Sequence, residues 1–308
     1  MPRYVTRGTK TRQARYRKRG YSKKKTYRRP ARPSRGRRRT PRMSQKSILN
    51  LTARKKRDTM LQWRQDAGVD GAGTAAIPPK AGNNGATTIF AWAPTARDLN
   101  IGTTGGRGTV SDIAARTAST VYNVGLKETI KIYAQEASSY MWRRICFTSK
   151  GLLAPLQSRT PISLLTSNGW VRYTKDLTSG GSGQAAALDV LRSVLFKGQL
   201  GVDWNDYITA PTDNQRVTIK YDRTTTLRSR GDDEIFYRTT RWHPMYKNMV
   251  YDDDEIGEDM AMSTTSTQGK QGMGDYIVID IIQPGPNVVG NGASAQIDIE
   301  STMYWHER

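Results

Sequence analysis

The sequence has few of the residues from which most metal sites and nucleophilic enzyme sites are built. Its 308 residues include one cysteine, Cys146, and two histidines, His243 and His306. A lone cysteine permits neither an intrachain disulfide nor a cysteine-based zinc site, which fits a reducing compartment. A Cys/His nucleophilic pair is arithmetically possible, but no local signature marks an orienting Asp or Asn. We therefore expect all three side chains to be buried or hydrogen-bonded.

Long apolar runs are also lacking. The mean hydropathy is −0.68, and no window approaches the roughly 18 consecutive apolar residues of a membrane-spanning helix. The longest mainly apolar stretch, residues 276–282, has the length of a strand. The N-terminus lacks the apolar region of a secretory signal. We expect no membrane partner.

Acidic residues are almost missing from the first part of the chain. Residues 1–60 hold 24 Lys/Arg and one acid, Asp58, whereas residues 61–308 hold 25 Lys/Arg and 26 acids. Of the net charge of +22, the first part therefore carries +23 and the rest −1. This division predicts an N-terminal segment that binds a polyanion, followed by an ordinary near-neutral globular body.

The basic segment predicts a nucleic-acid-binding arm, which we place at residues 1–57. With hardly an aliphatic residue before position 45, it is expected to be disordered alone in solution. Each Lys or Arg brought to a phosphate releases counterions, and interleaved tyrosines, Tyr4 included, can stack on unpaired bases, which favours single strands. The predicted nucleic-acid-binding residues are Arg12, Arg15, Tyr16, Arg17, Lys18, Arg19, Tyr21, Lys23, Lys24, Lys25, Tyr27, Arg28, Arg29, Arg35, Arg37, Arg38, Arg39 and Arg42.

Three clusters of basic residues punctuate the arm, and prolines separate the first two. Such clusters are typical of signals read by nuclear import receptors, so the chain is expected to enter the nucleus. The predicted localisation residues are Lys23, Lys24, Lys25, Arg37, Arg38, Arg39, Arg54, Lys55, Lys56 and Arg57.

Residues 58–308 predict an all-β body. Segments 129–134, 217–222 and 296–300 alternate apolar and polar residues, as strands with one wet face do, whereas 276–282 is apolar enough for a strand buried on both faces. Weaker candidates are 59–66, 141–148, 193–197 and 234–242, which makes about eight strands. Helix signal is confined to 184–191 and 112–118. Few helices and many separated strands favour a single jelly-roll β-sandwich with long loops.

The body offers no convincing catalytic or metal site. The acidic run 252–255, followed by Glu258 and Asp259, lacks the spacing of a calcium loop. We interpret it as a solvated loop or as a partner for a neighbour's arginines, and metal at a subunit contact is the alternative. The glycine-rich segments 102–108 and 180–183 lack a following Gly-Lys-Ser/Thr and are expected to be plain loops. We predict no enzyme activity, no cofactor and no metal.

Ordered short strings through the body give a family resemblance. They resemble the capsid proteins of genomoviruses, small circular single-stranded DNA viruses whose coat proteins are similar to those of geminiviruses. The strings are Leu195-Phe196-Lys197-Gly198, Gly201-Val202-Asp203-Trp204, Arg216-Val217, Tyr221-Asp222-Arg223, Trp242-His243-Pro244-Met245, Val250-Tyr251-Asp252-Asp253-Asp254-Glu255, Gly272-Met273-Gly274-Asp275 and Tyr304-Trp305.

The resemblance implies a structural function. About sixty jelly-roll copies would close into a T=1 icosahedral shell around a circular single-stranded DNA genome, with the arm inside. It also implies nuclear import by host receptors, so the expected locations are the virion and the host cell nucleus. It supplies no catalytic residue. A zinc-finger-like Cys/His cluster is often discussed for geminivirus coat proteins, and one cysteine with no histidine in the first 240 residues cannot form it.

Two other function classes stay open from the sequence. A cellular nucleic-acid-packaging or ribosomal-type protein would share the basic arm, although such proteins usually spread positive charge over their folded surface. An enzyme with a basic targeting arm, such as a nuclease, would need clustered carboxylates or histidines with a metal geometry.

Overall fold

A computed structural model describes residues 43–66, 69–77, 87–103, 105–134, 139–229, 234–285 and 295–308. By internal contacts the chain divides into two units, Met1–Ser44 and Gln45–Arg308. The second unit is built mainly from strands, with three helices among the described residues, and this confirms the all-β prediction.

The two large sheets of the second unit contain the longest strands. The first has the order β1-β18-β8-β14, with β4 paired to β18, and the second has the order β13-β9-β17-β5. All pairings in both sheets are antiparallel. Their bounds are β1 Arg54–Met60, β4 Ala75–Ile77, β5 Thr88–Trp92, β8 Thr120–Ala134, β9 Ser139–Ser149, β13 Thr218–Arg228, β14 Ile235–Val250, β17 Asp275–Pro284 and β18 Ala295–Glu307.

The remaining elements are short, apart from one helix. A third sheet pairs β2 with β3 and, in parallel, with β12, and three small hairpins complete the strands. The helices are α1 Gln45–Thr52, α2 Leu153–Gln157 and α3 Ser182–Leu195. The short strands are β2 Gln62–Asp66, β3 Val69–Ala72, β6 Asn100–Ile101, β7 Gly106–Arg107, β10 Leu165–Thr166, β11 Gly169–Trp170, β12 Arg172–Lys175, β15 Asp254–Ile256 and β16 Asp259–Ala261. None of these described helices is long and apolar enough to cross a membrane.

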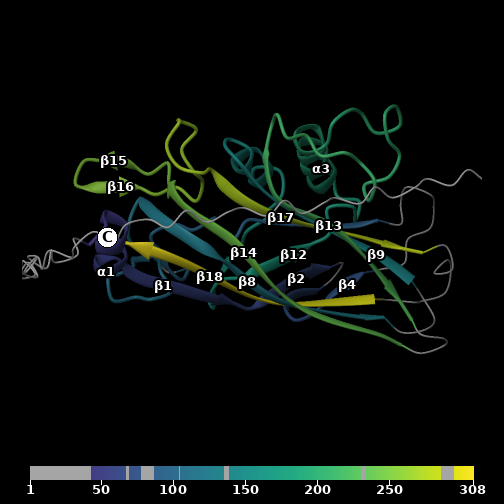
Figure 1. Cartoon of the computed structure of the whole chain (residues 1–308), viewed down its shortest axis with the longest axis horizontal. Helices are drawn as coiled ribbons and strands as arrows, with labels where there is room; N and C mark the ends of the chain where they lie inside the picture. Colours follow the sequence, from purple (N-terminus) through teal and green to yellow (C-terminus); the bar gives the residue numbers. More distant parts are fainter. Residues whose placement is uncertain are drawn as a thin grey trace, which may run out of the picture. The chain divides into compact units, whose positions relative to one another are not determined.

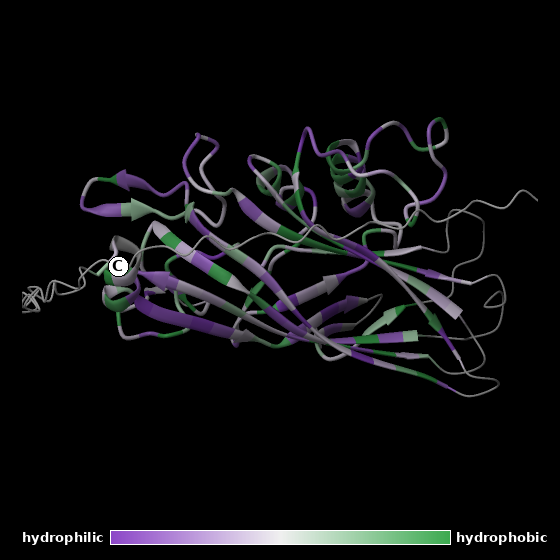
Figure 2. Cartoon of the chain, viewed as in Figure 1, coloured by the Kyte–Doolittle hydropathy of each residue, from purple (hydrophilic) through white to green (hydrophobic). Residues whose placement is uncertain are grey.

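The β1-β18-β8-β14 sheet has one buried and one accessible face. Along β8 and β18, buried residues alternate with partly or fully exposed ones over most of each strand. Figure 2 shows the same alternation of hydrophobic and hydrophilic colours. A period of two places successive side chains on opposite faces of a strand, so the alternating segments 129–134 and 296–300 were correctly predicted.

The second sheet is covered on both faces. Every residue of β5 is buried, as are the first eight residues of β17, which confirms the prediction for 276–282. Figure 1 shows α3 outside this sheet, on the side away from the β1-β18-β8-β14 sheet. Ala187, Leu191 and Leu195 of α3 share one apolar cluster with Ile279 and Phe147. The connection between β9 and β13 thus closes a face that an isolated sandwich would leave open.

The space between the two large sheets contains two apolar halves. One half includes Ile130, Trp142 and Ile282, and the other includes Leu126, Cys146 and Val278. Between these positions β8, β9 and β17 each place one polar residue facing inward, namely Glu128, Arg144 and Asp280. The polar residues form a buried belt across the sandwich, made of Glu128, Arg144, Arg172, His243, Asp280 and Ser301.

The belt is held together by ion pairs. Arg144 donates to Asp280 at 2.7 and 2.8 Å and to Glu128 at 2.5 Å. Arg172 donates to the same two carboxylates at 2.9 and 3.2 Å. These four side chains are at most 1% exposed, and their formal charges cancel. Trp142 also donates its indole N–H to Asp280 at 2.8 Å.

The guanidinium groups keep the belt carboxylates ionised. Burial alone would raise the pKa of Asp280, but Arg144 and Arg172 outweigh it and lower that pKa to about 2. The pKa of Glu128 is lowered in the same way against its own burial. Buried charges of this kind are tolerable only when paired and hydrogen-bonded, as they are here.

Two local predictions were wrong. Segment 193–197 was predicted as a strand, yet Ser193–Leu195 is the last part of α3, because burial of Ala187, Leu191 and Leu195 at a spacing of four follows a helical period. Segment 112–118 was predicted to be helical, but it forms no helix. Its carbonyls at Ile113 and Ala115 instead accept bonds from β1, at 3.1 and 2.8 Å.

Other elements were not predicted at all. Both α1 and β5 lie in segments where the sequence pattern predicts neither a helix nor a strand. By internal contacts α1 and β1 belong to the second unit, which begins at Gln45. The confirmed helix at 184–191 is longer than expected and extends to both sides.

Candidate nucleic-acid interface

The predicted nucleic-acid-binding residues lie outside the described part of the chain. All of them, from Arg12 to Arg42, fall within residues 1–42, together with the localisation residues at 23–25 and 37–39. Their role therefore stays a prediction that rests on charge and composition.

The third basic cluster has a different environment from the one expected. Residues 54–57 form most of β1, whose register with β18 places Lys56 opposite Trp305. Lys56 is buried and donates to the Ala115 carbonyl at 2.8 Å, the Thr117 hydroxyl at 2.9 Å and the Glu307 carboxylate at 3.0 Å. Lys56 thus stabilises the body and cannot reach an external polyanion.

The other three cations of this cluster remain accessible. Arg54, Lys55 and Arg57 are exposed on β1, which is hydrophilic along almost its whole length (Figure 2). β1 is also an edge strand of the β1-β18-β8-β14 sheet. Positive charge therefore continues from the arm onto the margin of the body.

The acidic run is divided between an internal ion pair and solvent. Asp253 accepts two bonds from Arg116, at 2.6 and 3.1 Å, and both side chains are almost fully buried. Asp259 pairs with Arg107 at the surface, while Asp254 and Glu255 are exposed. Apart from Asp253 the acidic run is exposed, as predicted, but it forms the β15–β16 hairpin, and the arginines it pairs with here belong to the same chain. A contact of this run with a neighbouring copy stays a prediction. Within the described ranges no three His, Cys, Asp or Glu side chains gather as metal ligands do.

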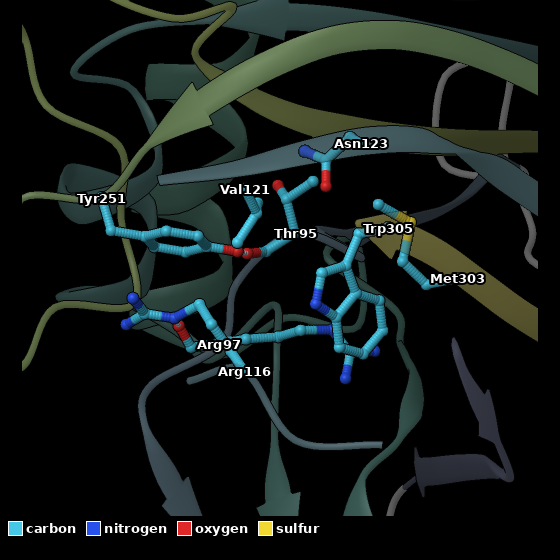
Figure 3. A pocket seen from close by; sticks show the side chains of 8 residues that line it. All are labelled: Thr95, Arg97, Arg116, Val121, Asn123, Tyr251, Met303 and Trp305. Carbon is cyan, nitrogen blue, oxygen red and sulfur yellow. Dashed lines mark hydrogen bonds between the residues drawn. The ribbon is translucent and has the colours of Figure 1, made fainter. Parts of the chain in front are cut away.

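One internal site is lined by Arg97, Arg116, Tyr251 and Trp305 (Figure 3). Arg116 lies 3.7 Å from the Tyr251 ring centroid, and Arg97 lies 5.1 Å from that of Trp305. Arg97 also donates to Asp58 at 2.6 Å. The side chains leave no space for even a water molecule. The arginines are therefore structural, and the site is not a ligand pocket.

Cys146 and His243 do meet in the interior, with Sγ and Nδ1 3.8 Å apart. Both side chains are buried, as predicted. Burial raises the pKa of the Cys146 thiol to about 12 and lowers the pKa of His243 to about 4. The thiol is thus protonated at neutral pH and has no route to a substrate, so the pair lacks the thiolate that nucleophilic catalysis needs. His306 is partly buried and faces Tyr122 with ring centroids 6.0 Å apart.

Comparisons with known proteins identify neither a family nor a fold for this chain. No protein family matches the chain, and no curated protein sequence matches it. Among solved structures, the structure of infectious bursal disease virus Gx strain is similar at a TM-score of 0.17 and 7% identity, over 82% of this chain and 81% of that chain. A TM-score this low carries no argument about function.

Proposed function

We propose that this protein is a structural capsid protein whose body is a jelly roll and whose basic arm packages single-stranded DNA. The observation that carries the proposal is the strand order. If the eight principal strands, β1, β5, β8, β9, β13, β14, β17 and β18, are counted along the chain, the sheets read 1-8-3-6 and 5-4-7-2. Antiparallel strands that alternate between two sheets in this way are what two successive Greek keys produce, and viral capsid domains use that architecture.

The position of the arm supports packaging. Residues 1–44 carry 19 Lys/Arg and no acid, and they lead through α1 directly into β1. The body that follows is close to neutral, which suits copies that must pack against one another. An arm attached to one sheet edge would concentrate positive charge on one side of a shell, where it neutralises a polyanion.

The proposal includes nuclear import, with a signal confined to two of the three basic clusters. Lys56 is buried and β1 is fully paired with β18, so the cluster at 54–57 is poorly suited to a receptor groove. We assign import to the clusters at 23–25 and 37–39. Replacing these six residues with Ser should leave a fluorescent fusion in the cytoplasm, whereas replacing Arg54, Lys55 and Arg57 alone should not.

Electron microscopy of the purified protein, followed by extraction of its nucleic acid, tests the capsid assignment. The expected result is closed shells that contain single-stranded DNA. With about sixty copies, the arms would bring about 1,100 positive charges, which neutralise about 1.1 kilobases, and mobile cations extend the comfortable length to roughly 3 kilobases. Dispersed monomers at all salt concentrations, or shells filled with duplex DNA, would contradict the proposal.

Binding by the arm is tested separately in the full chain. Replacing Lys23, Lys24, Lys25, Arg37, Arg38 and Arg39 with Ser should make the affinity for oligo-dT fall and its salt dependence flatten, because each phosphate contact contributes about 0.7 to the slope. The control replaces Arg159, Arg192 and Arg216 with Ser, which removes half as many charges from the connection that covers the second sheet, and it is compared with a variant in which only Arg37, Arg38 and Arg39 are replaced with Ser. An equal loss in that control would show that net charge alone governs binding.

A further inference from the structure

The accessible face of the β1-β18-β8-β14 sheet carries an unusual set of side chains. Three aromatic residues of the described chain are exposed, and all three lie on β14: Phe236 at 65%, Trp242 at 43% and Tyr246 at 57%. Exposed aromatic rings gathered on one strand are costly to leave in water, and they commonly mark a binding surface. The core does not use them, because the inward side of β14 is supplied by Ile235, Met245 and Met249.

Two of these rings form pairs across the sheet. Phe236 lies opposite Tyr133 of β8, with ring centroids 5.3 Å apart. Trp242 reaches Tyr304 of β18 at 5.7 Å, although β8 runs between their strands. Each pair presents two neighbouring rings, and one ring of each pair is exposed.

Gly125 of β8 makes the second pair possible. It is the register partner of Tyr304, and a Cβ built on it would lie 2.6 Å from Cζ2 of Trp242. The indole therefore lies against the bare backbone of β8, which any larger residue would prevent. Because Gly125 has no side chain, the Trp242 indole can extend across β8 to Tyr304.

Cations surround both pairs. Lys127 is exposed and lies opposite Trp242 in the ladder, and Arg238 is exposed opposite Lys131. Arg57 of β1 lies opposite Tyr304. The strands that form this face contribute two outward acids among the described residues, Asp298 and Glu300, and Asp298 pairs with Lys131 at 2.9 Å. The face is therefore aromatic and net positive.

We propose that this face is a second nucleic-acid-binding site, on which a single strand stacks its bases. Trp242 with Tyr304 forms one stacking position and Phe236 with Tyr133 forms the other. They are six residues apart along β14, or about 20 Å, a span of several nucleotides. Lys127, Arg57 and Arg238 lie where phosphates between the stacked bases would pass. Stacking on aromatic rings tolerates any base, so the site needs no sequence preference.

The inference rests on the proposed function, because it takes the packaged strand as the ligand. The connectivity of the chain supports the inference. The arm leads into β1, which is an edge strand of this same sheet, so the arm and the face can bind the same DNA molecule. A contact with a second copy of the chain fits less well. The cores of protein interfaces are depleted of lysine, whereas this face places Lys127 beside its central tryptophan.

Binding of a labelled oligo-dT to the full chain tests the site. Trp242→Ala should weaken binding about tenfold without changing the salt slope, because stacking releases no counterions. Trp242→Phe should recover part of the loss. The control Ile256→Ala truncates an apolar side chain that is 64% exposed on β15, and it should bind like wild type. Equal thermal midpoints for the variants establish that each is folded.

Photocrosslinking with an oligonucleotide that contains 5-iododeoxyuridine separates the remaining outcomes. Crosslinks at Trp242, Tyr304 or Phe236 support the site. Crosslinks confined to residues 1–42, with wild-type affinity for Trp242→Ala, would overturn it and leave the arm's function intact. Failure of the wild-type chain to bind DNA at all would instead remove the proposed function. Loss of assembly by Trp242→Ala with unchanged DNA affinity would identify the face as a contact between copies, and would also overturn the inference.

Discussion

The two large sheets of this protein use the same strand pairing but different surroundings. β17 and β5 are buried on both faces, because α3 and the rest of the β9–β13 connection cover the side that turns away from the first sheet. Among the described residues nothing comparable covers β8 and β18, and their outward positions hold Lys131, Asp298 and Tyr304. One sheet serves mainly as a scaffold, while the other keeps a face free for contact.

The interior and the accessible face also differ in the environment of their charged side chains. In the interior between the two sheets, charges are neutralised inside the protein, as in the belt of Glu128, Arg144, Arg172 and Asp280, to which β8 of the first sheet contributes Glu128. On the open face they remain accessible to solvent, as Lys127 and Arg238 do. A substitution in the buried belt should therefore change the stability of the protein, whereas one on the accessible face should change its binding to DNA.

The largest effect is expected in the belt. Asp280→Ala removes one of the two carboxylates that Arg144 and Arg172 share and leaves one buried positive charge in excess, so the free energy of unfolding should fall by about 3–5 kcal/mol, the usual cost of an uncompensated buried charge. Urea denaturation measures this directly. Asp298→Ala removes an acid from a solvent-accessible pair on the open face and should change little. Similar losses for both variants would contradict the contrast between the buried belt and the accessible face.

The next largest effect on stability is expected in α3, the helix that covers the second sheet. Leu191 is 1% exposed and packs within the cluster between α3 and the sheet. Leu191→Ala should lower the free energy of unfolding by about 2–4 kcal/mol through lost burial and the cavity left behind. Thr129→Ala, at an outward position of β8, is the control and should stay within about 0.5 kcal/mol of wild type. A small effect at Leu191 would show that α3 is not needed to close the sheet.

The belt also predicts a pH dependence. Burial lowers the folded pKa of His243 to about 4 from 6.5, so the unfolded state takes up a proton first as the pH falls. The stabilisation from neutral His243 is complete above pH 6.5 and is lost toward pH 4, by about 3 kcal/mol. Chemical denaturation of wild type and His243→Gln between pH 7 and 4 should show a stability difference that changes by this amount.

The comparison of wild type with His243→Gln is necessary because Asp275 also titrates in this pH range. Burial raises its folded pKa to about 6 from 3.8, so its contribution increases as the pH falls through the same range. In the wild type the two groups oppose each other, and only the comparison with His243→Gln isolates the histidine. A difference between the two proteins that stays constant from pH 7 to 4 would exclude the assignment.

The smallest expected change in stability concerns the open face. Gly125→Ala places a methyl group against the Trp242 ring and 2.7 Å from the His243 carbonyl oxygen, so it should cost about 1–3 kcal/mol. It should also displace the indole and weaken oligo-dT binding. Gly106→Ala adds a methyl group where nothing lies within 4 Å and serves as the control. Unchanged binding by Gly125→Ala would argue against the stacking position at Trp242.

Much of this protein was determined by local sequence pattern. Alternation at 129–134 and 296–300 and the continuous apolar run at 276–282 fixed the strands, because side-chain direction in a strand depends only on parity. The division of charge between residues 1–60 and the rest equally needed no structure. The same apolar run gave no indication of the partners of Asp280, which only the structure shows to be Arg144, Arg172 and Trp142.

Only the tertiary structure decided which side chains are partners. Lys56 was indistinguishable from Lys55 in the sequence, yet its register opposite Trp305 turns it inward to Glu307. Residues 193–195 became helical because α3 had a sheet face to cover. Trp242 reaches Tyr304 because Gly125, 117 positions earlier in the chain, lies under it. Each outcome depends on groups that are far apart in the sequence. Their interaction contributes to stability only after the chain has folded and brought them into contact.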